Sequence, residues 1–109
     1  MKILQVCGGP SWGGIEMQTV KLTLILQNAG HDTCVFCSAD GEILKNAVEK
    51  KLKTETGLFD PHKSWFHSLH CAKKIIREFR PDIIHVQRSH DLSVITAALR
   101  LMKCKTPLV

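Results

Sequence analysis

Strand-like and helix-like patterns alternate along the whole chain, and this alternation restricts the fold more than any other feature. Runs rich in apolar and β-branched residues, typical of strands, are followed by amphipathic runs with the helical period of about 3.6 residues. The expected strands are Lys2–Cys7, His31–Cys37, Leu52–Thr56, Asp82–Gln87 and Thr106–Val109, and the expected helices are Ile15–Ala29, Glu42–Lys51, Lys63–Phe79 and Asp91–Met102. Strands that alternate with helices are joined by crossovers and run parallel. The sequence therefore predicts an α/β fold, a parallel sheet with helices on both faces.

Each expected helix carries an apolar stripe that predicts which residues face the sheet. The stripes consist of Met17, Val20, Leu22, Leu24, Ile25, Leu26 and Ala29 in the first helix, Ile43, Leu44, Ala47 and Val48 in the second, Trp65, Leu69, Ala72, Ile76 and Phe79 with Phe66 and Ile75 beside them in the third, and Leu92, Ile95, Leu99 and Met102 in the fourth. Gly30 and Pro81 are expected to end the first and third helices.

Four glycines separate the first strand from the first helix, in the stretch QVCGGPSWGGIEMQT from Gln5 to Thr19. In parallel α/β sheets, ligands bind where strands end, and the free N–H groups of a following helix suit a phosphate. The stretch lacks the lysine of a P-loop and the spacing of a G-x-G-x-x-G loop. From the residues alone, tight-turn chemistry and a ligand site both remain open.

Composition narrows the class of protein. The chain has 109 residues, 44% of them hydrophobic and 23% charged, and a net charge of +5. These values are typical of a globular domain. The positive charge suits an anionic partner such as a phosphate or a membrane surface, or is simply a solvated lysine-rich surface. The basic residues are spread over several helices without stacking aromatics, so nucleic acid is not an expected partner. No apolar run reaches the roughly 18 residues that span a bilayer, and the expected location is cytoplasmic.

The five cysteines form no disulfide framework, and no metal or cofactor is expected. Cys34 and Cys37 lie three residues apart on an expected strand, so their thiols should point to opposite faces. His67, His70 and Cys71 have a helical spacing that can hold a metal, but lysine and arginine neighbours disfavour a cation, and complete sites need more ligands. We expect ordinary thiols in a reducing compartment.

The motifs taken together resemble a known family. A strand, a loop that ends in Gly-Gly-x-Glu, a helix that closes in Gly-His and a second strand resemble the start of a family-4-type glycosyltransferase of the GT-B fold; the matching residues are Gly13, Gly14, Glu16, Gly30 and His31. The family's later block RPDIIHVH appears as RPDIIHVQ, from Arg80 to Gln87, and the following RSHDL is similar to its lipopolysaccharide-type branch.

The resemblance implies two Rossmann-like domains that face each other across a cleft. Residues 1–109 would form a truncated amino-terminal, acceptor-side domain, and the carboxy-terminal domain that binds the nucleotide-diphosphate sugar would be absent. Gly13 and Gly14 would approach the phosphates and sugar of the donor. The complete enzyme would transfer a sugar to a polysaccharide or lipid-linked acceptor, with retention of configuration and without a metal, while this chain alone would be inactive.

Other residues are candidates for the acceptor side. Arg88 and His90 follow an expected strand on the ligand side of the sheet, where Arg88 could pair with a phosphate or carboxylate. Asp91 could cap the next helix. Glu16 suits the positive end of the first helix and could also contact the acceptor. His85, in mid-strand, reads as a hydrogen-bonded core residue.

Two further hypotheses concern partners. The helix Lys63–Arg80 is amphipathic and cationic, with Trp65 and Phe66 near its start, so it either packs as an ordinary core helix or contacts an anionic membrane at the inner face of the cell. The alternative to an enzyme is a stand-alone, non-catalytic flavodoxin-like module that binds a nucleotide or a protein.

Overall fold

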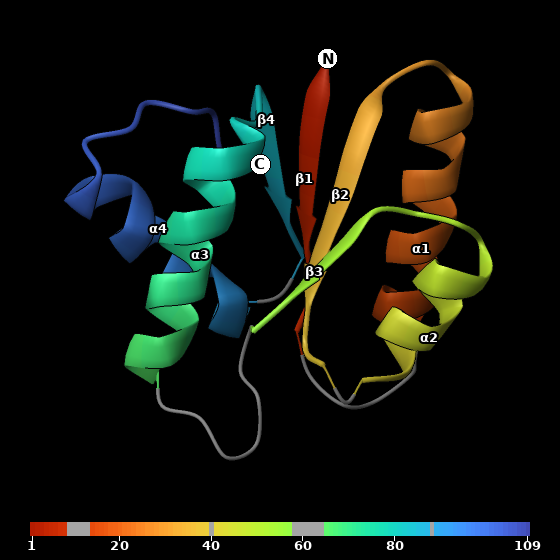
Figure 1. Cartoon of the computed structure of the whole chain (residues 1–109), viewed down its shortest axis with the longest axis horizontal. Helices are drawn as coiled ribbons and strands as arrows, with labels where there is room; N and C mark the ends of the chain where they lie inside the picture. Colours follow the sequence, from red (N-terminus) through yellow and green to blue (C-terminus); the bar gives the residue numbers. More distant parts are fainter. Residues whose placement is uncertain (9–13, 40, 58–64, 88) are drawn as a thin grey trace.

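A single parallel sheet forms the centre of the protein, with two helices on each face (Figure 1). The computed structural model describes residues 1–8, 14–39, 41–57, 65–87 and 89–109, and for Ser89 and His90 only the backbone. In chain order the elements are β1 (Lys2–Val6), α1 (Gly14–Asn28), β2 (Asp32–Cys37), α2 (Glu42–Glu49), β3 (Thr54–Thr56), α3 (Trp65–Phe79), β4 (Ile83–Val86) and α4 (Ser89–Leu101). The expected α/β alternation is confirmed.

The strand order is β3-β2-β1-β4, and every pairing is parallel. Leu4 at the centre of β1 lies opposite Cys34 of β2 on one side and Ile84 of β4 on the other. Leu108 makes a parallel bridge with Ile84, so the expected last strand begins beside β4. The chain thus adds β2 and β3 on one side of β1 and then returns to add β4 on the other side, so the strand order reverses between β1 and β4.

Two apolar clusters hold the helices to the sheet. The larger lies on the α3/α4 face and joins Leu4, Phe36 and Ile84 of the sheet to buried residues of both helices. The smaller lies on the α1/α2 face and includes Val20, Val35 and other apolar side chains. Figure 1 shows the two helix pairs on opposite sides of the strands. Burial on both faces explains why β1 and β4 read as near-continuous apolar runs.

The expected helix ends are confirmed. Gly30 follows α1 with a φ of +96°, a left-handed conformation that glycine adopts without strain. The α3 helix stops at Phe79, and Arg80 takes a φ of +51° directly before Pro81. Lys63, at the expected start of this helix, lies outside the described residues.

The inward face predicted for α1 is largely wrong. Met17 and Ile25 are 53% and 57% exposed, whereas Thr19 and Thr23 are completely buried with Val20. The Thr19 hydroxyl donates to the Ile15 carbonyl at 2.9 Å, and the Thr23 hydroxyl donates to the Thr19 carbonyl at 2.6 Å. Apolar residues occur almost all round this helix, so periodicity could not select a face. Threonines, small and able to bond within their own helix, take the positions against the sheet.

Single positions of the other helices also depart from their predicted stripes. Val48 of α2, Phe66 of α3 and Leu92 of α4 are exposed, while Ser68 and Val94 are buried in their place. Trp65 of α3 is also 37% exposed, so the predicted stripes extend too far toward the helix flanks that face solvent.

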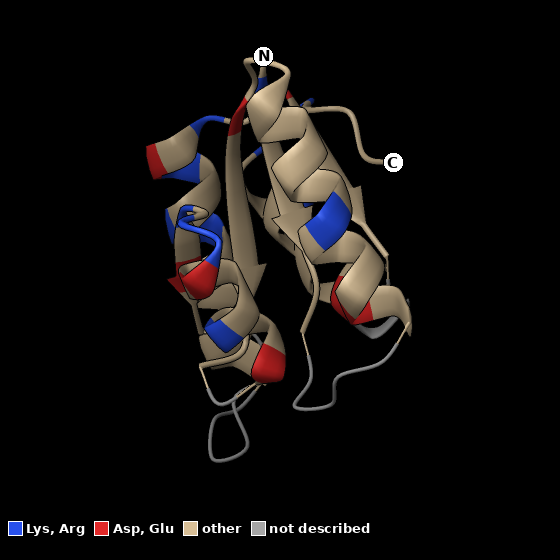
Figure 2. Cartoon of the chain, turned by 90° about the vertical axis from the view of Figure 1, so that its right-hand side faces the viewer, with Lys and Arg blue, Asp and Glu red and all other residues tan. Residues whose placement is uncertain are grey.

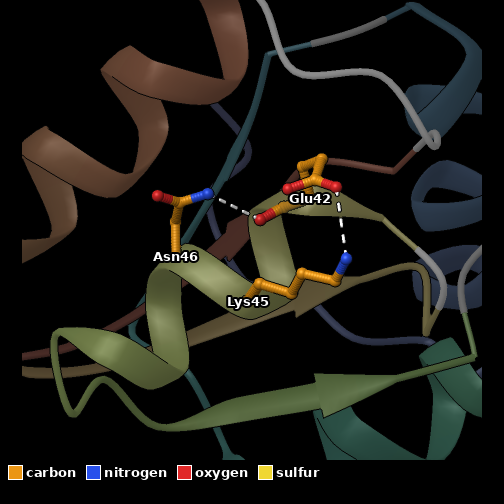
Figure 3. A network of polar contacts seen from close by, with 3 residues as sticks. All are labelled: Glu42, Lys45 and Asn46. Carbon is orange, nitrogen blue, oxygen red and sulfur yellow. Dashed lines mark hydrogen bonds and ion pairs between the residues drawn. The ribbon is translucent and has the colours of Figure 1, made fainter.

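The α2 helix begins without a side-chain cap. Its N-cap Gly41 makes no side-chain bond, and Glu42 occupies the first turn, where a negative charge is favourable. Lys45 Nζ lies 3.3 Å from Glu42 Oε1, and Asn46 Nδ2 donates to the Glu42 carbonyl at 2.8 Å (Figure 3). Both ion-pair partners are exposed, so this pair contributes at most about 1 kcal/mol.

The two cysteines of the C-x-x-C pattern diverge as predicted. Cys34 packs in the cluster on the α3/α4 face, and Cys37 packs in the cluster on the α1/α2 face. Because the two thiols lie on opposite faces of the sheet, they cannot act together as a redox or metal-binding pair.

Candidate functional site

The carboxyl edge of β1 and β4 is the candidate site, because these neighbouring strands lie at the point where the strand order reverses. Ligands of open α/β sheets bind at such switch points, outside the carboxyl ends of the strands. The chain leaves β1 through Cys7 and Gly8 and leaves β4 through Gln87, at the lower edge of the sheet in Figure 1. The sequence prediction and the topology therefore select the same edge.

Gly14 is the first residue of α1 and borders open space. A side-chain Cβ built there would find no atom of the described structure within 4 Å. The first turn of α1 therefore leaves room beside its backbone at Gly14, and it carries the partial positive charge of a helix amino terminus. Gly13, the other residue predicted to contact the phosphates and sugar of the donor, lies outside the described residues.

Glu16 also belongs to this first turn, but its side chain is only 5% exposed. A carboxylate near a helix amino terminus is favourably placed. Its burial places the Glu16 carboxylate within the packed structure, and contact with an acceptor stays a prediction.

Asp91 joins the two connections at this edge. Its Oδ2 accepts a hydrogen bond of 2.9 Å from the Gly8 backbone N–H, across 83 positions of sequence, and its side chain is 1% exposed. Sequence reasoning proposed only a helix-capping role for Asp91. The available signal was its place near the start of the helix that follows β4, because residues that follow neighbouring parallel strands meet at one edge.

The remaining predicted site residues are only partly described. Arg88 lies outside the described residues, and of His90 the structure gives the backbone, at the second position of α4. His85 is half-buried within β4, and its Nδ1 lies 2.9 Å from Gln5 Oε1. Since a carbonyl oxygen accepts, Nδ1 carries the proton. The predicted hydrogen bond of His85 is confirmed, but the residue is only partly buried.

The histidines and cysteine of α3 do not assemble a ligand set. His67 Nε2 lies 3.6 Å from Cys71 Sγ, whereas His70 is exposed. Within the described part of the chain, no group of three or more His, Cys, Asp or Glu side chains is arranged to hold a metal ion.

A separate apolar groove runs between α3 and α4. It has a volume of about 680 Å³ and is lined by Trp65, Phe66, Leu92, Arg100 and other residues. Trp65 Nε1 donates to Ser93 Oγ at 3.3 Å and ties the two helices, while the Trp65 and Phe66 rings meet edge to face with centroids 5.4 Å apart. A second groove of about 370 Å³, lined by Arg77, Arg80 and Met102, follows toward the end of α3.

The charges differ between the two halves of the chain. Over residues 65–87 and 89–109 there are seven lysines and arginines against three acids, whereas residues 1–8, 14–39 and 41–57 hold six against five. Figure 2 shows the α1/α2 side, where both signs occur. Of the described helices, none has both the length and the apolar character needed to cross a bilayer.

Solved structures share this fold. One is Alr3699/HepE of Anabaena in complex with UDP-glucose, with a TM-score of 0.75 and 19% identity over 99% of this chain and 28% of that one. Another is MurG of Acinetobacter baumannii, with a TM-score of 0.74 and 12% identity over 98% of this chain and 33% of that one. A third is the lipopolysaccharide outer core galactosyltransferase WaaB in its apo form, with a TM-score of 0.71 and 18% identity over 99% of this chain and 32% of that one. The chain spans about a third or less of each. No curated protein matches it by sequence.

The chain has a parallel α/β sheet with a candidate site at its switch point, and its structural neighbours have the GT-B fold. The chain is therefore a Rossmann-like domain of the GT-B fold. The family described as Glycosyltransferase Family 4 matches residues 12–109. The chain therefore belongs to the family 4 glycosyltransferases, as the motifs predicted.

Proposed function

We propose that this chain is the amino-terminal, acceptor-side domain of a glycosyltransferase that moves a sugar from a nucleotide-diphosphate donor to a glycan or lipid-linked acceptor. The supporting observation is the open amino terminus of α1 at the switch point, where Gly14 leaves the backbone bare. The resemblance to HepE, solved with UDP-glucose, and to the galactosyltransferase WaaB supports a nucleotide-sugar donor and a role in building cell-surface glycans.

The proposed chemistry is divided between two domains. The donor is held mainly by a carboxy-terminal domain, and this domain supplies the acceptor surface and the amino terminus of α1. As the bond between the sugar and the diphosphate breaks, negative charge grows on the departing diphosphate. A helix amino terminus already aimed at that charge stabilises it without rearrangement. Retention of configuration and independence of metal belong to the same proposal, and so does the inactivity of the isolated domain.

Substitution at Gly14 tests the proposal. In the complete enzyme Gly14→Leu is expected to reduce kcat/KM for the nucleotide sugar by about a hundredfold, because the side chain fills the space into which the phosphates must come. Gly14→Ala is the matched control with a smaller expected loss. In the isolated chain Gly14→Ala should not lower the thermal midpoint, because the added Cβ meets open space, and the thermal midpoint of Gly14→Leu is measured alongside. Unchanged turnover with Gly14→Leu would contradict the proposal.

The alternative is a non-catalytic flavodoxin-like module, and the same material separates it. If the chain binds UDP, GDP or CDP sugars by itself in a thermal-shift screen, and no longer form transfers sugar, the module is favoured. Transfer that requires the carboxy-terminal domain, yields a retained anomer by NMR and persists in EDTA favours the enzyme.

A second proposed function is peripheral contact with an anionic membrane through α3 and α4. Phe66 is 72% exposed and Leu101 is 63% exposed, and both line the groove that Arg100 borders. Exposed aromatic and aliphatic side chains beside arginines suit an interface with acidic lipids. Such contact would place the domain at the inner face of the membrane, near lipid-linked acceptors.

Vesicle binding measures this contact. The chain is expected to sediment with phosphatidylglycerol vesicles at low salt, to be released at high salt, and to ignore phosphatidylcholine vesicles. Phe66→Ser with Leu101→Ser should weaken binding, whereas Ile25→Ser, an exposed apolar position on α1, should not. Equal binding by both variants would contradict the assignment to this face.

A further inference from the structure

Two aspartates tie β1 to the segment around β4, one at each end of the strand pair. At the amino end, Asp82 Oδ2 accepts a hydrogen bond of 2.7 Å from the Lys2 backbone N–H. At the carboxyl end, Asp91 Oδ2 accepts the 2.9 Å bond from the Gly8 N–H. The two bonds have the same chemistry but very different surroundings, because the first is exposed and the second is buried.

Burial makes the Asp91 bond the stronger constraint. A carboxylate removed from water is tolerated only with hydrogen-bond donors or positive charge around it. Gly8 supplies one donor, and the first turn of α4, to which Asp91 belongs, supplies the positive end of a helix. A charge-assisted bond in such surroundings is stronger than one exposed to water.

The location of the bond gives it a consequence for the site. Gly8 is the last described residue before the connection from β1 to α1, and Asp91 is the third residue of the helix that follows β4. The bond therefore sets where the chain departs from β1 relative to the start of α4, on both sides of the switch point. Because its N–H is engaged by Asp91, Gly8 does not offer that group to a ligand.

We infer that Asp91 is a positioning residue, whose carboxylate fixes the backbone at Gly8 against the first turn of α4 and so shapes the carboxyl edge that receives the donor. The inference rests on the proposed glycosyl transfer for its functional part. Asp91 need not contact substrate. It acts through Gly8, and Asp82 provides a control of equal chemistry at the opposite end of the strands.

Amide hydrogen exchange in the isolated chain tests the structural part. Asp91→Ala is expected to speed exchange of the Gly8 N–H by about tenfold or more, corresponding to loss of a charge-assisted bond. Asp91→Asn retains an acceptor oxygen and should give an intermediate rate. Asp82→Ala should speed exchange at Lys2 and leave Gly8 unchanged. An unchanged Gly8 rate in Asp91→Ala would overturn the inference, and so would an equal effect of Asp82→Ala at Gly8.

Kinetics of the complete enzyme test the functional part. Asp91→Ala is expected to raise the KM for the nucleotide sugar by about tenfold, with partial rescue in Asp91→Asn and no change in Asp82→Ala. Thermal midpoints of the three variants, measured alongside, separate positioning from general destabilisation. If Asp91→Ala alters the Gly8 amide but neither KM nor kcat, the positioning role is overturned and the proposed transferase function stands. If the wild-type enzyme transfers no sugar, the proposed function fails, while the Gly8 exchange rates still decide whether the bond orders this edge.

Discussion

At the scale of single residues, polar side chains are concentrated where α1 covers the sheet. Gln5, Thr19 and Thr23 are completely buried, and Thr33 nearly so. Gln5 Oε1 is satisfied by His85, but Gln5 Nε2 and Thr33 Oγ1 have no partner among the described residues. An unsatisfied buried polar atom costs about 1–3 kcal/mol. The α1 face of the sheet is thus less stabilising than its burial suggests.

Cys34 gives a prediction for alkaline pH. Burial, with the negative charges of Glu55 and Asp32 adding to it, raises the pKa of the Cys34 thiol to about 12. In an unfolded chain a thiol ionises near pH of about 8.5. The raised pKa means that the native state holds the proton while the unfolded chain releases it. The contribution to stability is therefore complete below pH of about 8.5 and is lost as pH rises toward 12.

Urea unfolding at increasing pH measures this effect. The free energy of unfolding should decline across that alkaline window, and the decline should be smaller in Cys34→Ala than in a Cys104→Ala control. A thiol reagent should modify half-buried Cys104 before Cys34 in the native chain. Rapid native labelling of Cys34 would contradict the prediction.

Gly57 gives a second prediction at this scale. Its φ is +117°, and a Cβ there would lie 2.5 Å from Cys71 Sγ. Gly57→Ala is expected to lower the free energy of unfolding by about 1–3 kcal/mol through backbone strain and steric overlap. Gly30→Ala, with positive φ but open space, isolates the strain and should cost less. Equal losses in the two variants, measured by chemical denaturation, would show that the overlap contributes nothing.

At the scale of elements, the α1 helix carries apolar residues that are buried against the sheet and others that are exposed to solvent. Val20 packs in the smaller core cluster, whereas Ile25, similar in chemistry, is exposed. We predict that Val20→Ala lowers the free energy of unfolding by about 2 kcal/mol through loss of packing. Ile25→Ala should change it by less than about 0.5 kcal/mol. A larger loss for Ile25→Ala than for Val20→Ala in denaturant titrations would contradict this assignment and favour the inward face predicted from periodicity.

The strands and helices themselves could be predicted from the sequence, with bounds within about two residues, because strand and helix periods differ and glycine and proline mark the ends. The inward face of α1 could not be predicted, since its apolar residues surround the helix. The bond between Asp91 and Gly8 could not be predicted either. It depends on two strands far apart in sequence becoming neighbours, and only the fold shows this. The donor-binding role of Gly13 and Gly14 stays a prediction, and the open space at Gly14 leaves room for it.

At the scale of the whole molecule, stability should fall from the centre of the sheet to its edges. The β1 strand pairs on both sides, whereas β3 is a three-residue edge strand with two exposed positions. Amide exchange should therefore be slowest at Leu4 and Val6 and much faster at Glu55. Mass spectrometry or NMR of the isolated chain can rank these rates. Uniform rates across the sheet would mean that the strands open only together, by global unfolding.

The pairing of Gln5 with His85 has a consequence for how this sequence can vary. These residues are also register partners between β1 and β4. A slip of one position would set the buried amide against Ile84 or Val86 and leave it without an acceptor or donor. The hydrogen bond between the His85 imidazole and the Gln5 amide thus favours the native register of the two central strands. Replacing Gln5 or His85 alone should weaken the preference for the native register, because the remaining polar side chain loses its partner. Replacing both with aliphatic side chains removes that preference and also the cost of an unpaired buried polar group.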